Sequence, residues 1–255
     1  MSTGTPSTTN LITGEQDSVV QGVDGRKVTL PFPQAIAGRA VTLVTRQLRQ
    51  IYTYFRQQPK GSITTSELYL AGELVLQTEF EALKTQVQNY FLRHRLPYQP
   101  NFDSALVLSF SGILEYWRKL VGDLQKSRSE ELLFTVDTKT KPSLTTKFEP
   151  VDFAVLGLGG FWLTAQGLLT RVNLLSQDFV YTTLNTATVG VAKENDVCAL
   201  WWRTEEDLLV CSRCEAYGHG GNLGHGMYSL DALPLELPPF HPHCRCDWEI
   251  IIVTN

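Results

Sequence analysis

The chain has 255 residues, of which 43% are apolar, so it can bury a sizeable core in one large domain or two smaller ones. Its formal net charge of −4 gives no electrostatic reason to expect binding to nucleic acid or to an anionic membrane. The N-terminus lacks the apolar stretch of a signal peptide, and no unbroken apolar run is long enough to span a membrane. We therefore expect a protein made in the cytoplasm, with reduced cysteines.

The N-terminal part of the chain divides into a polar arm and a helical region. Residues 1–34 are rich in Ser, Thr, Gly and Asn and show little apolar periodicity, which predicts a flexible arm. Across residues 35–134, apolar side chains recur at spacings of three and four residues, which predicts long amphipathic helices. We interpret residues 35–134 as a helical region that docks on a partner.

Start and stop signals divide this region into three helices. The first begins near Ala35 and ends before Pro59. The second begins at Thr64, because Glu67 follows it at the spacing of a capping box. The third begins after Asp103. The leucine and aromatic stripes on these helices are typical of a core and not of a ligand site.

The second half of the chain changes character. Residues 135–150 combine lysines, threonines and a proline, which predicts a linker or extended arm. Residues 151–255 then predict an α+β domain, with a helix from Leu174 to Lys193 and strands at 199–203 and 247–253. The predicted fold class is therefore α+β, with long N-terminal helices followed by a small zinc-clipped β domain at the C-terminus.

All five cysteines lie between Cys198 and Cys246, and four of them form two close pairs. Two pairs of thiols with histidine nearby are what a tetrahedral zinc site needs. The candidate ligands are Cys211, Cys214, His241, Cys244 and Cys246. The C-x-x-C pair is the first choice and Cys244 the next, while His241 and Cys246 compete for the fourth position.

Three further histidine and cysteine residues are not expected to bind a metal. His219 and His225 lie in a glycine-rich loop, where histidines are more often exposed to solvent than bound to a metal. Cys198 stands apart from both pairs and is expected to be an ordinary buried cysteine.

The segment around the cysteines resembles a known family. Trp202-Arg203-Thr204, Asp207 and Val210-Cys211-x-x-Cys214, followed by Pro238-Pro239-Phe240-His241-Pro242-x-Cys244-Arg245-Cys246, is similar to the C-terminal signature of the Mu F-like head morphogenesis proteins of tailed phages. The resemblance covers roughly residues 175–250. It implies a virion component, a minor head protein near the portal, that works in head morphogenesis or capsid assembly. The glycine- and histidine-rich loop between the two cysteine pairs departs from the family pattern.

We therefore expect a structural virion protein, not an enzyme, that forms part of a head or head–tail connection. Its expected partners are portal, capsid or neck subunits of a symmetric assembly, without membrane contact. The alternative is a zinc-dependent hydrolase or toxin-like enzyme that uses the same metal site, although no H-E-x-x-H motif is present. Residues 198–255 carry three basic and eight acidic residues, which argues against a nucleic-acid-binding zinc module.

Overall fold

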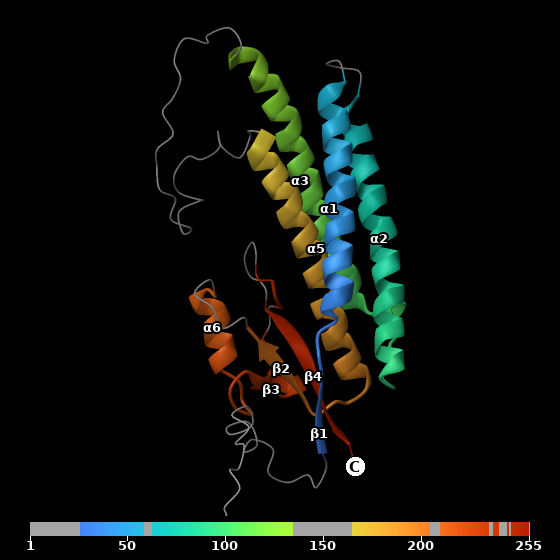
Figure 1. The fold of residues 1–255 in the computed structure, drawn as a ribbon, viewed down its shortest axis with the longest axis vertical. Coiled ribbons are helices and arrows are strands. Elements are labelled where there is room, and N and C mark those ends of the chain that lie inside the picture. The colour runs from blue at the N-terminus through green and yellow to red at the C-terminus, as the bar shows by residue number, and fades with distance from the viewer. Residues whose placement is uncertain are drawn as a thin grey trace, which may run out of the picture.

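The chain folds into a bundle of four long helices with a small sheet at one end (Figure 1). The computed structural model describes residues 26–58, 63–134, 165–204, 210–234, 237–239, 244 and 246–254. The helices are α1 (Gln34–Gln57), α2 (Thr65–Arg93), α3 (Ser104–Phe134), α5 (Ala165–Glu194) and the short α6 (Ser212–His219). The strands are β1 (Arg26–Leu30), β2 (Ala199–Arg203), β3 (Met227–Tyr228) and β4 (Asp247–Thr254). The α+β class predicted from the sequence is confirmed.

The three predicted N-terminal helices form close to their expected bounds. The capping box at the start of α2 is present: the Thr64 hydroxyl accepts from Glu67 N at 3.1 Å, and a Glu67 carboxylate oxygen accepts from Thr64 N at 2.6 Å. Helix α5 begins at Ala165 and not at Leu174, so its N-terminal part was missed by the sequence pattern. None of the described helices is both long enough and apolar enough to cross a membrane.

The four strands form one antiparallel sheet in the order β1-β4-β2-β3. Strand β1 pairs with β4 from Leu30 opposite Ile250 to Arg26 opposite Thr254. This corrects the prediction of a flexible arm over residues 1–34, whose last part is an edge strand followed by the start of α1. The sequence pattern missed β1 because only Val28 and Leu30 of its five residues are apolar, which is too short an alternation to detect.

One hydrophobic core runs from the bundle into the sheet. Phe80 of α2 stacks on Phe110 of α3, with ring centroids 4.1 Å apart, and Phe110 in turn contacts Phe179 of α5. At its other end α5 packs on strand β4, where Trp248 is fully buried. The predicted boundary between residues 35–134 and 151–255 therefore does not separate two cores among the described residues. The predicted linker, 135–150, lies outside them.

Candidate metal centre

Three buried thiols meet where helix α6 approaches the start of strand β4. The sulfur atoms of Cys214, Cys244 and Cys246 all lie within 4.8 Å of one another, and those of Cys214 and Cys244 are 3.7 Å apart. Each of the three side chains is at most 5% exposed. Three thiols at such distances, shielded from water, could hold a metal ion.

Helix α6 positions the first of these thiols. Cys211 is the N-cap residue of α6, and its sulfur accepts a hydrogen bond from Cys214 N at 3.4 Å. The C-x-x-C segment is thus the start of a helix of eight residues.

Strand β4 positions the other two thiols. Cys244 and Cys246 precede the strand, and both sulfurs point into the same cluster, as their spacing of two residues predicts for extended backbone. The strand is fixed in the middle of the sheet by β1 on one side and β2 on the other. Trp248 N also donates to the Asn185 amide oxygen of α5 at 3.0 Å.

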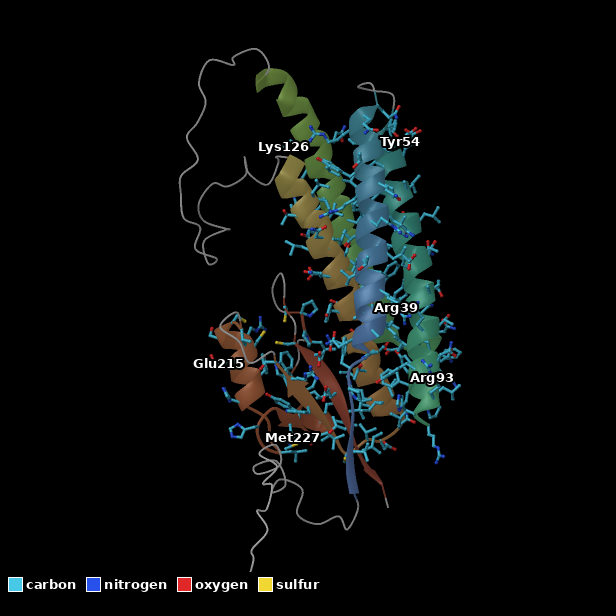
Figure 2. All side chains as sticks on the ribbon, viewed as in Figure 1. Arg39, Tyr54, Arg93, Lys126, Glu215 and Met227 are labelled. Atoms are coloured by element: carbon cyan, nitrogen blue, oxygen red, sulfur yellow. The ribbon has the colours of Figure 1, made fainter. Side chains whose placement is uncertain are left out.

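Aromatic side chains fill the space between α6 and the sheet. The Trp202 ring of β2 lies 5.2 Å from Tyr217 of α6 and 5.0 Å from Trp248 of β4, measured between centroids. Tyr228 of β3 packs edge-on against Trp248, and its hydroxyl donates to Tyr217 O at 2.9 Å. Figure 2 shows α6, which carries Glu215, standing beside the sheet and apart from the bundle. The aromatic residues therefore seal the inner side of α6.

In the glycine- and histidine-rich segment 218–226, Gly218 and His219 end α6, and residues 220–226 form a compact connection to β3. Gly226 has a φ of +64°, and its carbonyl accepts from Trp202 N at 2.7 Å. A Cβ there would lie 2.7 Å from Trp202 O, so any larger residue would push the loop away from β2. Asn222 and Ser229 close the loop with two side-chain hydrogen bonds.

The thiols of Cys214 and Cys246 have raised pKa values in the absence of a cation. Hydrogen bonding to Cys244 and then Cys246, together with burial, raises the pKa of Cys214. For Cys246, the contact with Cys214 works to lower the pKa, but the contact with Cys244 and burial outweigh it, so the pKa is raised. A divalent cation would supply the missing positive charge and reverse this preference.

The structure brings together three of the five candidate ligands, and Cys211 lies beside them as the partly exposed N-cap of α6. The fifth candidate, His241, lies outside the described residues. His219 and His225 are exposed, as expected, with ring centroids 6.0 Å apart.

The expectation that Cys198 is buried is wrong. Cys198 is exposed, and its thiol donates to Ile251 O at 2.9 Å. It alternates with Val197 and Ala199, which are both buried, so the extended backbone turns the Cys198 side chain to the opposite face.

A buried polar group beside the thiols was not anticipated from the sequence. The carboxylate of Asp247, next to Cys246, accepts from the Gln34 amide at 2.8 Å, and Glu249 pairs with Arg203 at 2.8 Å. Both acids are nearly fully buried in β4. Two acids in an otherwise apolar strand could have indicated these contacts from the sequence, because a buried acid needs a hydrogen-bonding or charged partner.

Comparison with known proteins adds no relative to this picture. No protein-family model, curated protein or solved structure matches the chain.

Proposed function

We propose that the thiol cluster is a structural zinc site. The carrying observation is the convergence of three buried cysteine sulfurs from two separate elements. Thiolates are the ligands that select zinc over the hard cations, and a structural zinc takes four ligands. Cys211, at the N-cap of α6, and His241 are the candidates for the fourth position.

The metal would clamp α6 to the start of β4. A helix of eight residues has little stability of its own, because helix nucleation is unfavourable and few bonds follow it. A metal bound by Cys214 on one side and by Cys244 and Cys246 on the other would join two segments 30 residues apart in sequence. Three thiolates also donate much charge to the ion, which leaves a bound water poorly activated and favours a structural role over hydrolysis.

We further propose that the chain is a structural component of a tailed-phage particle, at the head or the portal-proximal neck. Support comes from the sequence signature around Cys211 and Cys244. Exposed apolar side chains on the bundle also suit docking on other virion subunits. The largest of these are Tyr54, Leu70, Leu74, Leu92, Phe102 and Leu108.

Metal analysis of the full-length protein tests the first proposal. We expect about one zinc per chain, lost on Cys214→Ser and retained on Cys198→Ser. Well under half an equivalent of zinc in the native protein would contradict a structural zinc. Peptidase or nuclease activity that disappears in Cys214→Ser, with the fold retained, would instead favour the hydrolase alternative.

Proteomic analysis of gradient-purified particles tests the second proposal. The chain should copurify with the portal and capsid proteins in a fixed ratio. Its presence only in the cytosol of infected cells would contradict a role in the virion, whatever the metal content.

A further inference from the structure

Helix α1 has an unusual charge composition. Its 24 residues include Arg39, Arg46, Arg49 and Arg56 but no aspartate or glutamate. The remaining polar positions are threonines, glutamines and tyrosines. The helix is amphipathic: Ile36, Val44, Leu48 and other apolar residues are buried, whereas all four arginines are exposed. One complete face of α1 is therefore positively charged.

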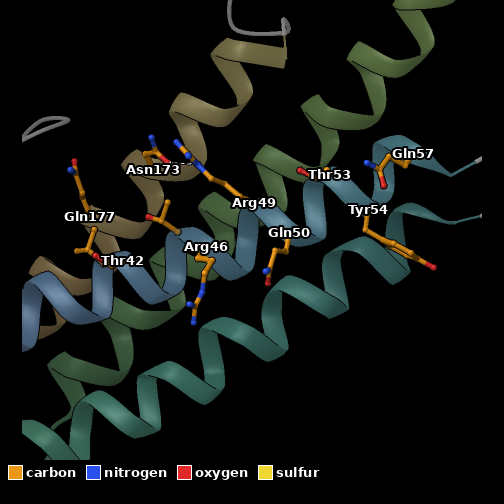
Figure 3. A pocket seen from close by; sticks show the side chains of 11 residues that line it. Thr42, Arg46, Arg49, Gln50, Thr53, Tyr54, Gln57, Asn173 and Gln177 are labelled. Carbon is orange, nitrogen blue, oxygen red and sulfur yellow. Dashed lines mark hydrogen bonds between the residues drawn. The ribbon is translucent and has the colours of Figure 1, made fainter.

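A groove lies along this face between α1 and α5 (Figure 3). Its volume is about 750 Å³, and Arg46 and Arg49 line it together with threonine, glutamine and asparagine side chains. Arg49 Nε donates to the Asn173 amide oxygen of α5 at 3.0 Å, which holds the guanidinium at the wall of the groove. No carboxylate is among the lining residues.

Two acids of the neighbouring helices have partners other than these arginines. Glu79 of α2, which reaches α1, accepts from the Gln47 amide at 3.4 Å. Asp123 of α3 pairs with Arg171 of α5. Within the described part of the chain, no carboxylate forms an ion pair with Arg46 or Arg49. The positive charge of the groove is thus left for a ligand.

The arginines form a row and not a single pocket. Arg39 and Arg46 are seven residues apart, so they lie on the same side of the helix about 10 Å from each other. Arg49 and Arg56 repeat this spacing on an adjacent stripe, and the whole row extends for about 25 Å. Figure 2 shows Arg39 near one end of α1 and Tyr54 near the other. A row of this length suits an extended polyanion better than a single small anion.

We propose that this face of α1, with its groove, binds the phosphodiester backbone of a nucleic acid strand. Arginine, threonine, glutamine, asparagine and tyrosine are the side chains that donate to phosphate oxygens. An acidic protein partner would need several apolar side chains as anchors, whereas Val41 and Tyr54 are the apolar or aromatic residues among the eleven that line the groove and the other nine are polar or charged. The net charge of −4 argues against nucleic acid only when charge is averaged over the chain; the fold concentrates positive charge on one helix face.

The test is binding of the full-length protein to a labelled single-stranded oligonucleotide of about 20 nucleotides, followed by fluorescence anisotropy at about 50 to 200 mM salt. With four phosphate contacts, the logarithm of the association constant should fall with the logarithm of salt concentration at a slope of about −3. The double variant Arg46→Gln/Arg49→Gln should weaken binding about tenfold or more and halve this slope.

The matched control is Arg93→Gln/Lys119→Gln, which removes the same charge from exposed positions on α2 and α3. It should leave the affinity within about twofold. Absence of binding at low salt, equal weakening by the control variant, or preferential binding of polyglutamate over the oligonucleotide would each overturn the proposal.

Discussion

The helical bundle and the sheet region of this protein are held together by different physical means. In the bundle, long helices bury regular stripes of apolar residues, such as Leu76 and Leu83 of α2, which are fully inaccessible to solvent. In the sheet region, short strands surround a few large aromatic rings, and the buried atoms include thiols and carboxylates. The bundle depends on apolar area, whereas the sheet region depends on specific polar contacts and, in our proposal, on a bound metal.

The two regions should therefore respond differently to single substitutions. Apolar burial is spread over many side chains, so a single change in the bundle removes only part of its stability. The proposed metal site is different, because losing one ligand would expose the others to protonation and release the ion. The two regions nevertheless share α5, whose one end packs in the bundle and whose other end packs on β4. The following changes test how far the regions behave separately.

Loss of the metal should have the largest effect, and it should fall on the sheet region. Chelation or Cys214→Ser removes a binding free energy on the order of 10 kcal/mol. We expect loss of the near-ultraviolet circular dichroism of Trp202 and Trp248, while the far-ultraviolet helical signal largely persists. The exposed Cys198→Ser change should alter stability by less than about 0.5 kcal/mol. Simultaneous loss of all helical signal would show that the two regions unfold as one unit.

Truncation of Trp117 should have the next largest effect, in the bundle. This side chain is fully buried in α3, and its indole N–H donates to Tyr69 O at 3.0 Å. Trp117→Ala should cost about 3–5 kcal/mol in chemical denaturation, because it leaves a cavity between α2 and α3. At denaturant concentrations below the unfolding midpoint, the variant should bind as much zinc as the unsubstituted protein. Release of zinc at the same denaturant concentration at which the bundle unfolds would contradict separate stabilisation of the two regions.

Two glycine substitutions should have opposite signs. A Cβ on Gly72 of α2 would lie 2.1 Å from the Trp117 ring, so Gly72→Ala should destabilise by about 1–3 kcal/mol. A Cβ on Gly112 of α3 meets nothing within 4 Å, so Gly112→Ala should stabilise by up to about 1 kcal/mol. Thermal melts of both variants measure the pair. A stabilising Gly72→Ala would mean that α2 and α3 approach less closely than the structure indicates.

Removal of the α2 cap should have the smallest effect. Thr64→Ala should cost about 1 kcal/mol near neutral pH, because Glu67 N loses its acceptor. Hydrogen bonds from the Thr64 backbone and side chain hold the pKa of Glu67 below its ordinary value of 4.5. The contribution of the charged Glu67 is therefore complete above pH 4.5 and fades as the pH falls through the folded-state pKa. Urea titrations at neutral and acidic pH should show a smaller penalty in acid; a larger penalty in acid would contradict the capping box.

The amino-acid sequence alone determined the local structure of the bundle. The periodicity of apolar residues specified α1, α2 and α3, and the Thr64–Glu67 spacing specified where α2 begins. Both strands flanking the cysteines, 199–203 and 247–254, were also predicted, apart from the last residue. These features depend on neighbours within a few positions, and such neighbours are visible in the sequence.

The cysteine pairs likewise predicted a candidate metal site, but the positions of the individual cysteines in it could not be predicted. The sequence could not show that Cys211 caps a helix or that Cys246 reaches the same cluster as Cys214. Both facts depend on how α6 is placed against β4, through the rings of Trp202 and Tyr217.

Only the tertiary structure decided the long-range pairings. Strand β1 lies in a segment that resembles a polar arm, and it becomes a strand because β4 offers it an open edge more than 200 residues further along the chain. The arginine face of α1 differs, because the spacing of its arginines is visible in the sequence and only the acidic average over the whole chain masks it. Backbone hydrogen bonds between distant strands leave no periodic trace in the sequence, because their partners are neighbours only in space.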